Sequence, residues 1–260
     1  MNDFSDQIAV VTGAASGIGR QLSLDLVHRG ARVFAIDINE VPGEVPGSNG
    51  QGRLTPVVCD LSDPSSYAEL LRQLEADQGR IDLLANIAGV DRPVSMLVGD
   101  VQLFQQVMQI NFFAPLVGTL TVLPGMVKRR HGYVVNVSSD SIRSPIANAA
   151  AYIASKGAIT SLTESAALEV KEFGVHVHVL YPGFVYTGMG RDSIARGMRA
   201  PPKMVVRTPE QVSALTLRRL GGDRIEINAA PLGVLTPLLK TFAPTIFRRV
   251  MRSRAMPIGT

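Results

Sequence analysis

The 260-residue sequence predicts an α/β fold: a doubly wound, Rossmann-type parallel sheet with helices on both faces, in a single domain. Three observations support this prediction. Short apolar runs alternate with longer amphipathic stretches, and the first short run leads directly into a glycine-rich turn. Hydrophobic residues make up 46% of the chain and charged residues 18%, which excludes a disordered protein. A chain of this length can bury a full core without disulfides or metal.

The expected elements follow one another in the order strand, then helix. The strands are expected where short runs rich in Val, Ile and Leu leave no polar face, as in parallel sheets covered on both sides: residues 8–11, 32–36, 54–59, 83–86, 132–137 and 175–180. Amphipathic stretches after them predict helices that begin near Ile18, Ser65, Val101, Ala151 and Thr208. The stretches 101–130 and 151–173 are the longest helices of this set.

The pattern changes after residue 187. Residues 188–207 mix Gly, Arg, Met and Pro without periodicity, which predicts an irregular substrate lid. A last strand is expected at 224–228, followed by a C-terminal extension over 229–260. The Pro/Gly-rich stretch 41–52 is interpreted as a surface loop, so residues 1–260 form one domain.

The net charge of +4 is unevenly distributed. Residues 191–260 carry 13 Lys and Arg against 4 Asp and Glu, whereas residues 1–190 carry 13 against 18. Such a basic segment can meet nucleic acid, an anionic membrane or an acidic ligand, but it is more often a solvated helix face. We therefore expect no nucleic-acid partner and at most a weak membrane-surface contact by the basic tail.

Cysteine count and the N-terminus favour a cytoplasmic protein. Cys59 is the only cysteine, so no internal disulfide forms, and no basic segment precedes the first apolar run as in a signal peptide. We expect no apolar run that reaches the roughly 18 residues of a membrane span. Four scattered histidines and one cysteine do not make a zinc site, so no metal is expected.

The first strand runs into the sequence TGAASGIG at residues 12–19 and then into a helix. A glycine-rich turn in this place lets the backbone approach a pyrophosphate, and the helix N-terminus supplies N–H groups. The alternative is a tight turn with no ligand. The residues expected to contact the cofactor here are Gly13, Ser16, Gly17, Ile18 and Gly19.

The second strand leads to Asp37, 24 residues after Gly13. A carboxylate in this place can accept hydrogen bonds from both ribose hydroxyls and repels a 2′-phosphate. No Arg or Lys stands at residues 14–16, and Ile38 follows the aspartate. These facts favour NAD, with NADP as the second choice, unless Asp37 merely caps a strand end.

The segment 152–156 places Tyr152 and Lys156 four residues apart, on one face of a helix. A phenol titrates near pH 10. A neighbouring ammonium and the positive nicotinamide ring are expected to lower that pKa, so that Tyr152 exchanges a proton with a substrate oxygen near neutral pH. Ser139 ends a strand thirteen residues earlier, at the edge where α/β proteins bind ligands. Ser138 is the alternative to Ser139.

Taken in chain order, these motifs resemble those of the short-chain dehydrogenase/reductase family, single-domain type. The matching segments are TGAASGIG (12–19), Asp60, NIAG (86–89), Asn111, Ser139, YIASK (152–156) and PGFVYT (182–187). The resemblance implies that Tyr152 is the acid/base, that Ser139 binds the substrate oxygen, and that Lys156 lowers the tyrosine pKa and holds the nicotinamide ribose. It also implies that Asn111 holds a water that links Lys156 to solvent.

The resemblance also implies the remaining cofactor contacts. Asp60 would contact the adenine amino group, and Thr187 with the Val185 backbone would hold the carboxamide. The other residues expected along the cofactor are Leu61, Asn86, Ala88, Gly89, Pro182 and Gly183. In the family, the helices 101–130 and 151–173 pair across a subunit interface, so a homodimer or homotetramer is expected.

Two departures from the family pattern concern the substrate side. Ile142 stands where the family often has Gly, and Asp140 is a charge among usually small residues; if buried, it would need Arg143 as its partner. The long C-terminal extension resembles the subgroup that acts on bulky apolar alcohols and ketones. Its apolar residues fall on one helical face, which packs on the domain or a subunit, borders the pocket, or rests on a membrane: Leu235, Leu238, Leu239, Phe242, Ile246, Phe247 and Val250.

The sequence therefore predicts an NAD(H)-dependent alcohol dehydrogenase or carbonyl reductase acting on a small-molecule alcohol or ketone. One alternative is a non-catalytic NAD-binding regulator or scaffold. Another is a sugar-nucleotide epimerase or dehydratase, for which the chain lacks a large substrate domain. Outside the site, we expect His176 and His178 on the less buried side of their strand and Cys59 as an inert thiol within a strand.

Overall fold

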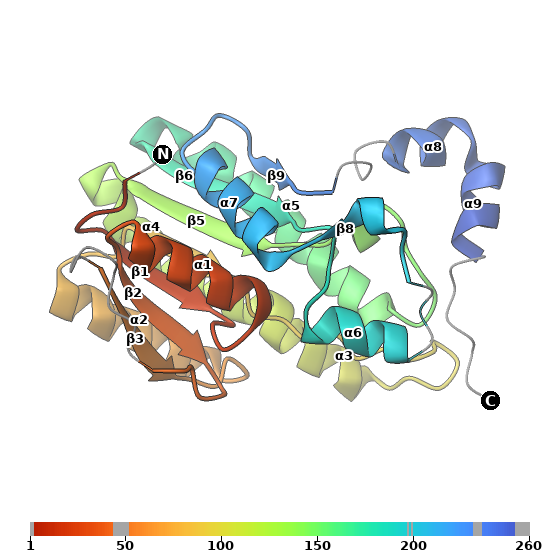
Figure 1. Ribbon diagram of the computed structural model, residues 1–260, viewed down its shortest axis with the longest axis horizontal. Helices are drawn as coiled ribbons and strands as arrows, with labels where there is room; N and C mark the ends of the chain where they lie inside the picture. The colour runs from red at the N-terminus through yellow and green to blue at the C-terminus, as the bar shows by residue number, and fades with distance from the viewer. Residues whose placement is uncertain (1–2, 44–51, 197, 199, 231–235, 253–260) are drawn as a thin grey trace.

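The computed structural model describes residues 3–43, 52–196, 198, 200–230 and 236–252. Seven strands form one parallel sheet in the order β3-β2-β1-β4-β5-β6-β9, which confirms the predicted doubly wound α/β fold (Figure 1). The strands of this sheet are β1 (Ile8–Thr12), β2 (Arg32–Asp37), β3 (Arg53–Val58), β4 (Leu83–Asn86), β5 (Gly132–Val137), β6 (Val175–Tyr181) and β9 (Glu226–Asn228). Every neighbouring pair in it is parallel.

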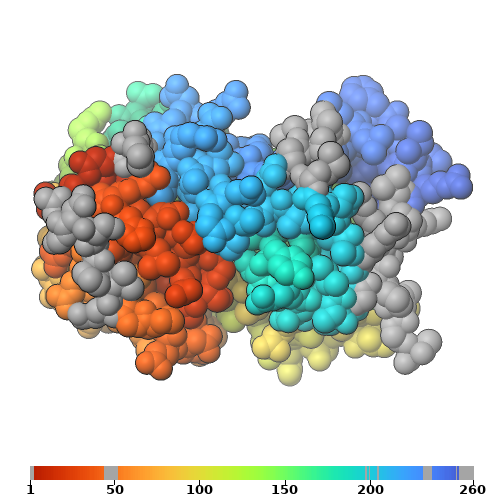
Figure 2. All heavy atoms as spheres, viewed as in Figure 1, coloured from red at the N-terminus to blue at the C-terminus, as the bar shows by residue number. Residues whose placement is uncertain are grey.

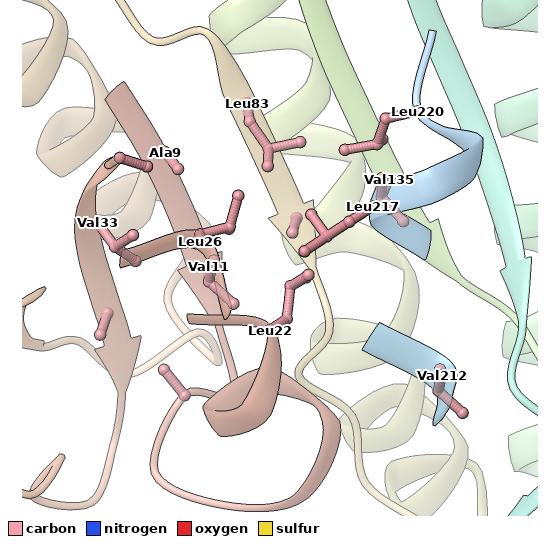
Figure 3. Close-up of a cluster of buried hydrophobic side chains, with 14 of the residues drawn as sticks. Ala9, Val11, Leu22, Leu26, Val33, Leu83, Val135, Val212, Leu217 and Leu220 are labelled. Carbon is pink, nitrogen blue, oxygen red and sulfur yellow. The ribbon is translucent and has the colours of Figure 1, made fainter. Parts of the chain in front are cut away.

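Helices cover both faces of the sheet. The α-helices of the described residues are α1 (Gly17–His28), α2 (Pro64–Gln78), α3 (Val101–Met108), α4 (Ala114–Arg129), α5 (Ala150–Val170), α6 (Gly188–Ala195), α7 (Pro209–Arg219), α8 (Thr236–Phe242) and α9 (Pro244–Arg252), of which α8 and α9 lie away from the sheet. Helices α1 and α7 pack side by side on one face, where Leu22, Leu26 and Leu217 meet the strand residues Val11 and Val135 (Figure 3). On the other face, α2, α4 and α5 bury a second cluster against Val10 and Ile36.

The strands form because their side chains are buried on both faces. All five residues of β1 are buried, and four of them, Ile8, Val10, Val11 and Thr12, are branched at the Cβ atom. The strand order reverses between β1 and β4, which opens a crevice at the carboxyl ends of these strands. The Thr12 hydroxyl links the ends of β1 and β4 beside this crevice, since it accepts hydrogen bonds from the Ile87 and Ala88 amides at 3.0 and 3.1 Å.

Two expectations about strand residues are wrong. Cys59 lies just after β3 rather than within it. His178 is only 1% exposed, because β6 lies between β5 and β9 and is covered on both faces. Both nitrogens of the His178 ring are hydrogen bonded. Nδ1 donates to the Arg224 carbonyl at 2.9 Å, and Nε2 accepts from the Gly221 amide at 3.3 Å. Burial lowers the pKa of His178, so the imidazole is neutral at pH 7.

The stretch 101–130 is not one regular helix. Between α3 and α4 the backbone makes a π-helical turn, η1 (Gln109–Phe113), which carries Asn111. By length and composition, Val101–Arg129 meets the requirements of a membrane span, so the expectation that no run does so is wrong. In this fold its buried residues, among them Val122 and Met126, pack in the layer between α2, α5 and the sheet.

The region 188–207 is more ordered than its irregular sequence predicts. Thr187 caps α6 by accepting a hydrogen bond from the Gly190 amide at 3.5 Å. A short 3-10 turn, η4 (Lys203–Val205), leads into β8 (Val206–Arg207), which pairs in parallel with β7 (Phe184–Val185). Gly188 and Gly190, both in the first turn of α6, disfavour a helix by propensity, which is why the sequence pattern misses α6.

Candidate active site

A cavity of about 1300 Å³ occupies the crevice at the carboxyl ends of the strands. Most of the predicted site residues line it, although they come from distant parts of the chain. The lining members of the predicted set are Gly13, Ser16, Gly17, Ile18, Gly19, Asp37, Asp60, Leu61, Ala88, Gly89, Ser139, Tyr152, Lys156, Pro182, Gly183, Val185 and Thr187. The fold therefore brings the glycine-rich turn, the Tyr-Lys pair and the segment 182–187 to one site.

The glycine-rich turn leaves no room for side chains. Gly13 has φ +70°, and a Cβ added there would stand 2.9 Å from the Ala88 backbone. Gly17 has φ +55°, and a Cβ there would meet the Thr187 side chain at 2.9 Å. A Cβ on Gly19 would overlap the Gly13 carbonyl oxygen. This bare cradle at the start of α1 fits the diphosphate of a dinucleotide, which the amides of a helix N-terminus can bind.

Asp37 ends β2 at the rim of the same cavity. Its Oδ2 accepts a hydrogen bond from the Ala15 amide at 3.0 Å, and its Oδ1 accepts from the Asn39 amide at 2.9 Å. These bonds fix the carboxylate beside the glycine-rich turn, so it both terminates the strand and faces the cavity. Among the described residues that line the cavity, Lys156 is the only lysine or arginine.

Asn86 and Asn111 do not line the cavity, unlike the other predicted residues. The Asn86 side chain points to the opposite side of the strand end, where its Nδ2 donates to Asn136 Oδ1 at 2.8 Å and its Oδ1 accepts from the Tyr67 hydroxyl at 3.0 Å. The Asn86 side chain therefore does not face the cavity, and the contact of this residue with the cofactor stays a prediction. Adjacent residues of a strand point to opposite faces, and this alternation turns the Asn86 side chain away from the cavity.

Asn111 lies behind the wall of the cavity and is fully buried. Its amide accepts from the Val90 amide at 2.8 Å and donates to the Val90 carbonyl at 2.9 Å and to Ser155 Oγ at 3.0 Å. A Cβ added at Gly89 would stand 3.2 Å from Asn111 Oδ1 and 3.4 Å from Lys156 Nζ. Asn111 thus holds the segment after β4 next to the lysine, and its link to solvent through water stays a prediction.

Tyr152 and Lys156 share one face of α5, as their spacing predicts. Lys156 is 3% exposed, and its Nζ lies 5.8 Å from the centroid of the Tyr152 ring. The ammonium donates a hydrogen bond to the Val137 carbonyl at 2.9 Å, which joins α5 to the end of β5. Phenol and ammonium therefore project into the cavity from α5, opposite the residue that ends β5.

The two serines that follow β5 have different surroundings. Ser138 is fully buried, and its hydroxyl is bonded to the Lys156 carbonyl at 3.0 Å and to Thr160 Oγ1 at 2.6 Å. Ser139 instead lines the cavity and hydrogen bonds the Tyr152 phenol. Its Oγ also accepts from Ser141 Oγ at 2.9 Å and from the Ser141 amide at 3.2 Å. This arrangement favours Ser139 over Ser138 as the group that holds a substrate oxygen.

The ionisation of the pair differs from the expectation. Burial raises the pKa of Tyr152 to about 12, whereas its hydrogen bond to Ser139 acts in the opposite direction. Burial also lowers the pKa of Lys156 to about 8. The expectation that the lysine lowers the tyrosine pKa is therefore not what this structure shows, because desolvation dominates both groups. At neutral pH the phenol carries its proton.

Asp140 and Arg143 form the ion pair that burial of Asp140 was expected to require, with 3.3 Å between Oδ1 and the guanidinium. Arg143 also donates to Asn228 Oδ1 at 2.6 Å and to Glu226 Oε2 at 2.9 Å, and it lies 3.8 Å above the centroid of the Tyr181 ring. The arginine therefore ties the turn after Ser139 to β6 and β9. The sequence showed only the first of these partners.

The substrate part of the cavity has mostly apolar walls. They are formed by the segments 140–149 and 188–205, including Ile146, Ala149, Met189, Met198, Pro201 and Val205. Two charged residues, Asp91 and Asp140, also line this part, and each has one buried oxygen without a hydrogen-bond partner among the described residues. Burial raises the pKa of both carboxyls. Asp91 also pairs with Arg196, just past α6, at 3.6 Å, so it connects the segment after β4 to the wall formed by residues 188–205.

Sequence reasoning missed three residues that shape the site: Thr12, Asp91 and Ser141. Thr12 is the first residue of the matched motif TGAASGIG, and Asp91 lies two residues after NIAG. Ser141 lies two residues beyond Ser139, a spacing at which a serine hydroxyl can bond the backbone and side chain that follow it. The signal in each case is proximity to a motif, which does not by itself assign a role.

Comparison with known proteins identifies the family. Residues 7–196 match the family model of the short chain dehydrogenases. The chain is 30% identical to dehydrogenase/reductase SDR family member 7B of Bos taurus over 95% of this chain and 81% of that protein. It is 36% identical to oxidoreductase UcpA of Escherichia coli O157:H7 over 87% of this chain and 86% of that protein. The chain belongs to the short-chain dehydrogenase/reductase family and is an oxidoreductase of that family.

Solved structures agree with this family and fold. One, from Beutenbergia cavernae, is named for an NAD(P)-dependent gluconate 5-dehydrogenase and holds NADP at low occupancy. It superposes with a TM-score of 0.78 at 25% identity, covering 89% of this chain and 98% of that one. A metagenomic short-chain oxidoreductase in complex with NADP gives a TM-score of 0.70 at 26% identity over 86% and 96% of the two chains. The crevice described above is therefore a Rossmann-type site for NAD(P).

Proposed function

We propose that this protein is an NAD(H)-dependent oxidoreductase that interconverts a bulky, apolar secondary alcohol and its ketone. The observation that carries the proposal is the convergence of Ser139, Tyr152 and Lys156 on a cavity whose other part is the glycine cradle beside Asp37. Glycine cradle, ribose-binding carboxylate and proton donor are the three parts that hydride transfer to a carbonyl requires.

A bound nicotinamide would supply a hydride to the carbonyl carbon in reduction and accept one from the alcohol carbon in oxidation. Ser139 holds the substrate oxygen, and the Tyr152 phenol donates its proton to that oxygen during reduction. Because burial raises the pKa of Tyr152 to about 12, the proton is present at neutral pH, which suits the reductive direction. Lys156 holds the nicotinamide ribose, and Asp37 holds the adenosine ribose. The apolar walls exclude water from the reacting atoms.

The proposal is tested with purified protein, both oxidised and both reduced cofactors, and a panel of secondary alcohols and ketones of increasing size. Formation or loss of the reduced nicotinamide with a bulky member of the panel supports the proposal. Tight cofactor binding without turnover on any member would instead favour a non-catalytic NAD-binding regulator or scaffold.

Substitutions at Asp37 and Ile38 are expected to change the preference between NADH and NADPH. Replacing Asp37 by Ala and Ile38 by Arg removes a repulsion and adds a phosphate partner, because Ile38 is 61% exposed at the cavity rim. We expect the ratio of kcat/KM for NADPH over NADH to rise by about 10- to 100-fold, the worth of one charge-assisted contact. Steady-state rates with each cofactor measure this ratio.

The matched control changes Asn39 to Ala and leaves Asp37 in place; it should keep the preference for NADH. The comparison of the two cofactors is informative because two similar solved structures hold NADP, whereas Asp37 is proposed to select NAD. A wild-type protein that already prefers NADPH in the same comparison would contradict the assignment of Asp37 as an NAD-selecting residue.

Self-association is proposed through α4 and α5, as the family resemblance implies. These helices and the turns at their ends expose apolar side chains, among them Leu120 and Leu168, which are 61% and 70% exposed. We expect the wild type to be a dimer or tetramer, and Leu168→Asp to reduce its mass in light scattering, since a buried unpaired carboxylate opposes association. Leu97→Asp, in an exposed loop, is the control; equal behaviour of both variants would contradict this interface.

A further inference from the structure

The C-terminal helices α8 and α9 form a hairpin at one end of the molecule, beyond α6 and β8 (Figure 1). The two helices contact each other, and the Phe247 side chain on α9 is only 5% exposed. They follow one another closely in the chain, since the Ala243 amide donates to the Leu239 carbonyl at 3.0 Å and the Phe247 amide donates to the Ala243 carbonyl at 2.9 Å. The hairpin is visible at the surface of this end of the molecule in Figure 2. It lies outside the sheet and the helices that cover it.

The hairpin leaves large apolar side chains in solvent. Phe242 lies four residues after Leu238 and three residues after Leu239, so these side chains share one face of α8. Phe242 is 82% exposed, and Ile246 at the start of α9 is 60% exposed. We call these four side chains the apolar face of the hairpin: Leu238, Leu239, Phe242 and Ile246. Such a group of exposed apolar side chains marks a surface that meets a partner.

The charge of the same segment has one sign. Residues 227–260 contain five Lys and Arg and no Asp or Glu. Three of these cations, Lys240, Arg248 and Arg249, are exposed on the described helices. On α8, Lys240 stands about 100° or more around the helix from Leu238, Leu239 and Phe242, as the helical repeat requires. Apolar and cationic side chains are thus both exposed, and on α8 they are separated.

We propose that the α8–α9 hairpin binds the surface of an anionic lipid bilayer, with its apolar face in the headgroup–acyl boundary and its cations on lipid headgroups. Exposed aliphatic and aromatic side chains beside a strongly basic segment are what an interfacial helix requires. A second copy of the chain fits this surface less well, because a two-fold contact would bring the same basic segments together without an acidic partner.

The position of the hairpin gives this contact a consequence for the cavity. Ala230 and Thr236, the first residue of α8, both line the cavity. Docking through the hairpin therefore brings this part of the cavity close to the bilayer. Apolar substrates dissolve in bilayers, so this arrangement would let them enter from the lipid. This consequence rests on the proposed function, but binding to lipid does not.

The test is co-sedimentation of the full-length protein with vesicles of phosphatidylcholine, with and without phosphatidylglycerol. We expect sedimentation with the anionic vesicles at low salt and its loss at high salt, where a Debye length of about 3 Å at 1 M screens the contact. No sedimentation with anionic vesicles at low salt, or equal sedimentation with neutral ones, would overturn the proposal.

Variants separate lipid binding from general effects. Arg248→Gln with Arg249→Gln should weaken partitioning onto anionic vesicles by about 10-fold or more, since each surface cation contributes substantially to binding. The matched control, Arg218→Gln with Arg219→Gln, removes two adjacent exposed arginines at the end of α7 and should bind like the wild type. Equal losses in both pairs would contradict a role for the hairpin.

Phe242→Ser tests the apolar face, with Phe173→Ser, at a partly exposed phenylalanine near β6, as its control. Only the first variant should lose vesicle binding, while NAD binding shows that both are folded. If Phe242→Ser instead lowers the molecular mass in solution without changing vesicle binding, the face is an interface between subunits and the proposal is wrong.

Discussion

Replacing Tyr152 by Phe is expected to lower kcat for ketone reduction by about 1000-fold, within the range that a general acid contributes. The substitution removes one oxygen atom, and the ring that packs against α5 and the cavity wall remains. Among the described residues of the cavity wall, the Tyr152 hydroxyl alone both forms a hydrogen bond with Ser139 and lies on the same face of α5 as Lys156. Cofactor affinity should change little, because the phenol acts on the substrate.

The measurements for Tyr152→Phe are single-turnover rates and NADH titration by fluorescence. Tyr133→Phe is the matched control, since Tyr133 stacks on His176 outside the cavity and its loss should leave kcat within about 2-fold of wild type, as for surface changes away from the chemistry. If Tyr152→Phe retained more than about a hundredth of the wild-type rate, the assignment of the proton donor would be wrong.

The pH dependence of the wild type should reflect the same group. With the pKa of Tyr152 raised to about 12 by burial, the phenol stays protonated through neutral pH, and reduction of a ketone does not lose its proton donor there. Alcohol oxidation needs the phenolate as base, so its rate should rise with pH over the same range. A reduction rate that changes little with pH, together with an oxidation rate that rises, is thus the expected signature of Tyr152.

The sequence predicted the parts of the fold that depend on local pattern. Strands such as β1 and β4 are continuous apolar runs, and the turn at Gly13 and Gly17 requires positive φ, so both are visible without tertiary information. The i, i+4 spacing placed Tyr152 and Lys156 on one face for the same reason. Parallel topology then sends the ends of these elements to one edge of the sheet.

What the sequence did not predict depends on which side of an element a residue faces and on its burial. Asn86 ends the predicted strand but points away from the cavity toward Tyr67 and Asn136. His178 is buried because β9 covers its strand, a pairing that the alternation of residues 175–180 does not reveal. The pKa values of Tyr152 and Lys156 follow from desolvation, which a spacing rule leaves out.

Replacing Lys156 by Met is expected to lower kcat by about 100-fold or more and yet to stabilise the cofactor-free protein at pH 7. Burial lowers the pKa of Lys156 from 10.5 to about 8, so at pH 7 the folded state carries a charge that it disfavours. At 1.36 kcal/mol per pKa unit, this costs about 3 kcal/mol of the free energy of unfolding. Met removes that cost and fills a similar volume.

The gain is reduced by the lost hydrogen bond from Nζ to the Val137 carbonyl, which contributes about 1.5–3 kcal/mol because its donor is charged. The net stabilisation at pH 7 is therefore about 1 kcal/mol, or about 2–4 °C in Tm for a chain of this size. Tm is measured without cofactor, because a ligand that Lys156 helps to bind would stabilise the wild type alone.

The sign of the pH dependence distinguishes this account from a simple packing effect. Between pH 8 and 10.5 the folded state releases its proton before the unfolded state does, so the wild type gains stability relative to the Met variant as pH rises. Met should thus be the more stable protein at pH 7 and the less stable one near pH 10, where only the lost hydrogen bond remains. Lys171→Met, at an exposed lysine, should show no such crossing. A Met variant that is destabilised equally at both pH values would show that Lys156 is not held charged against a desolvation cost.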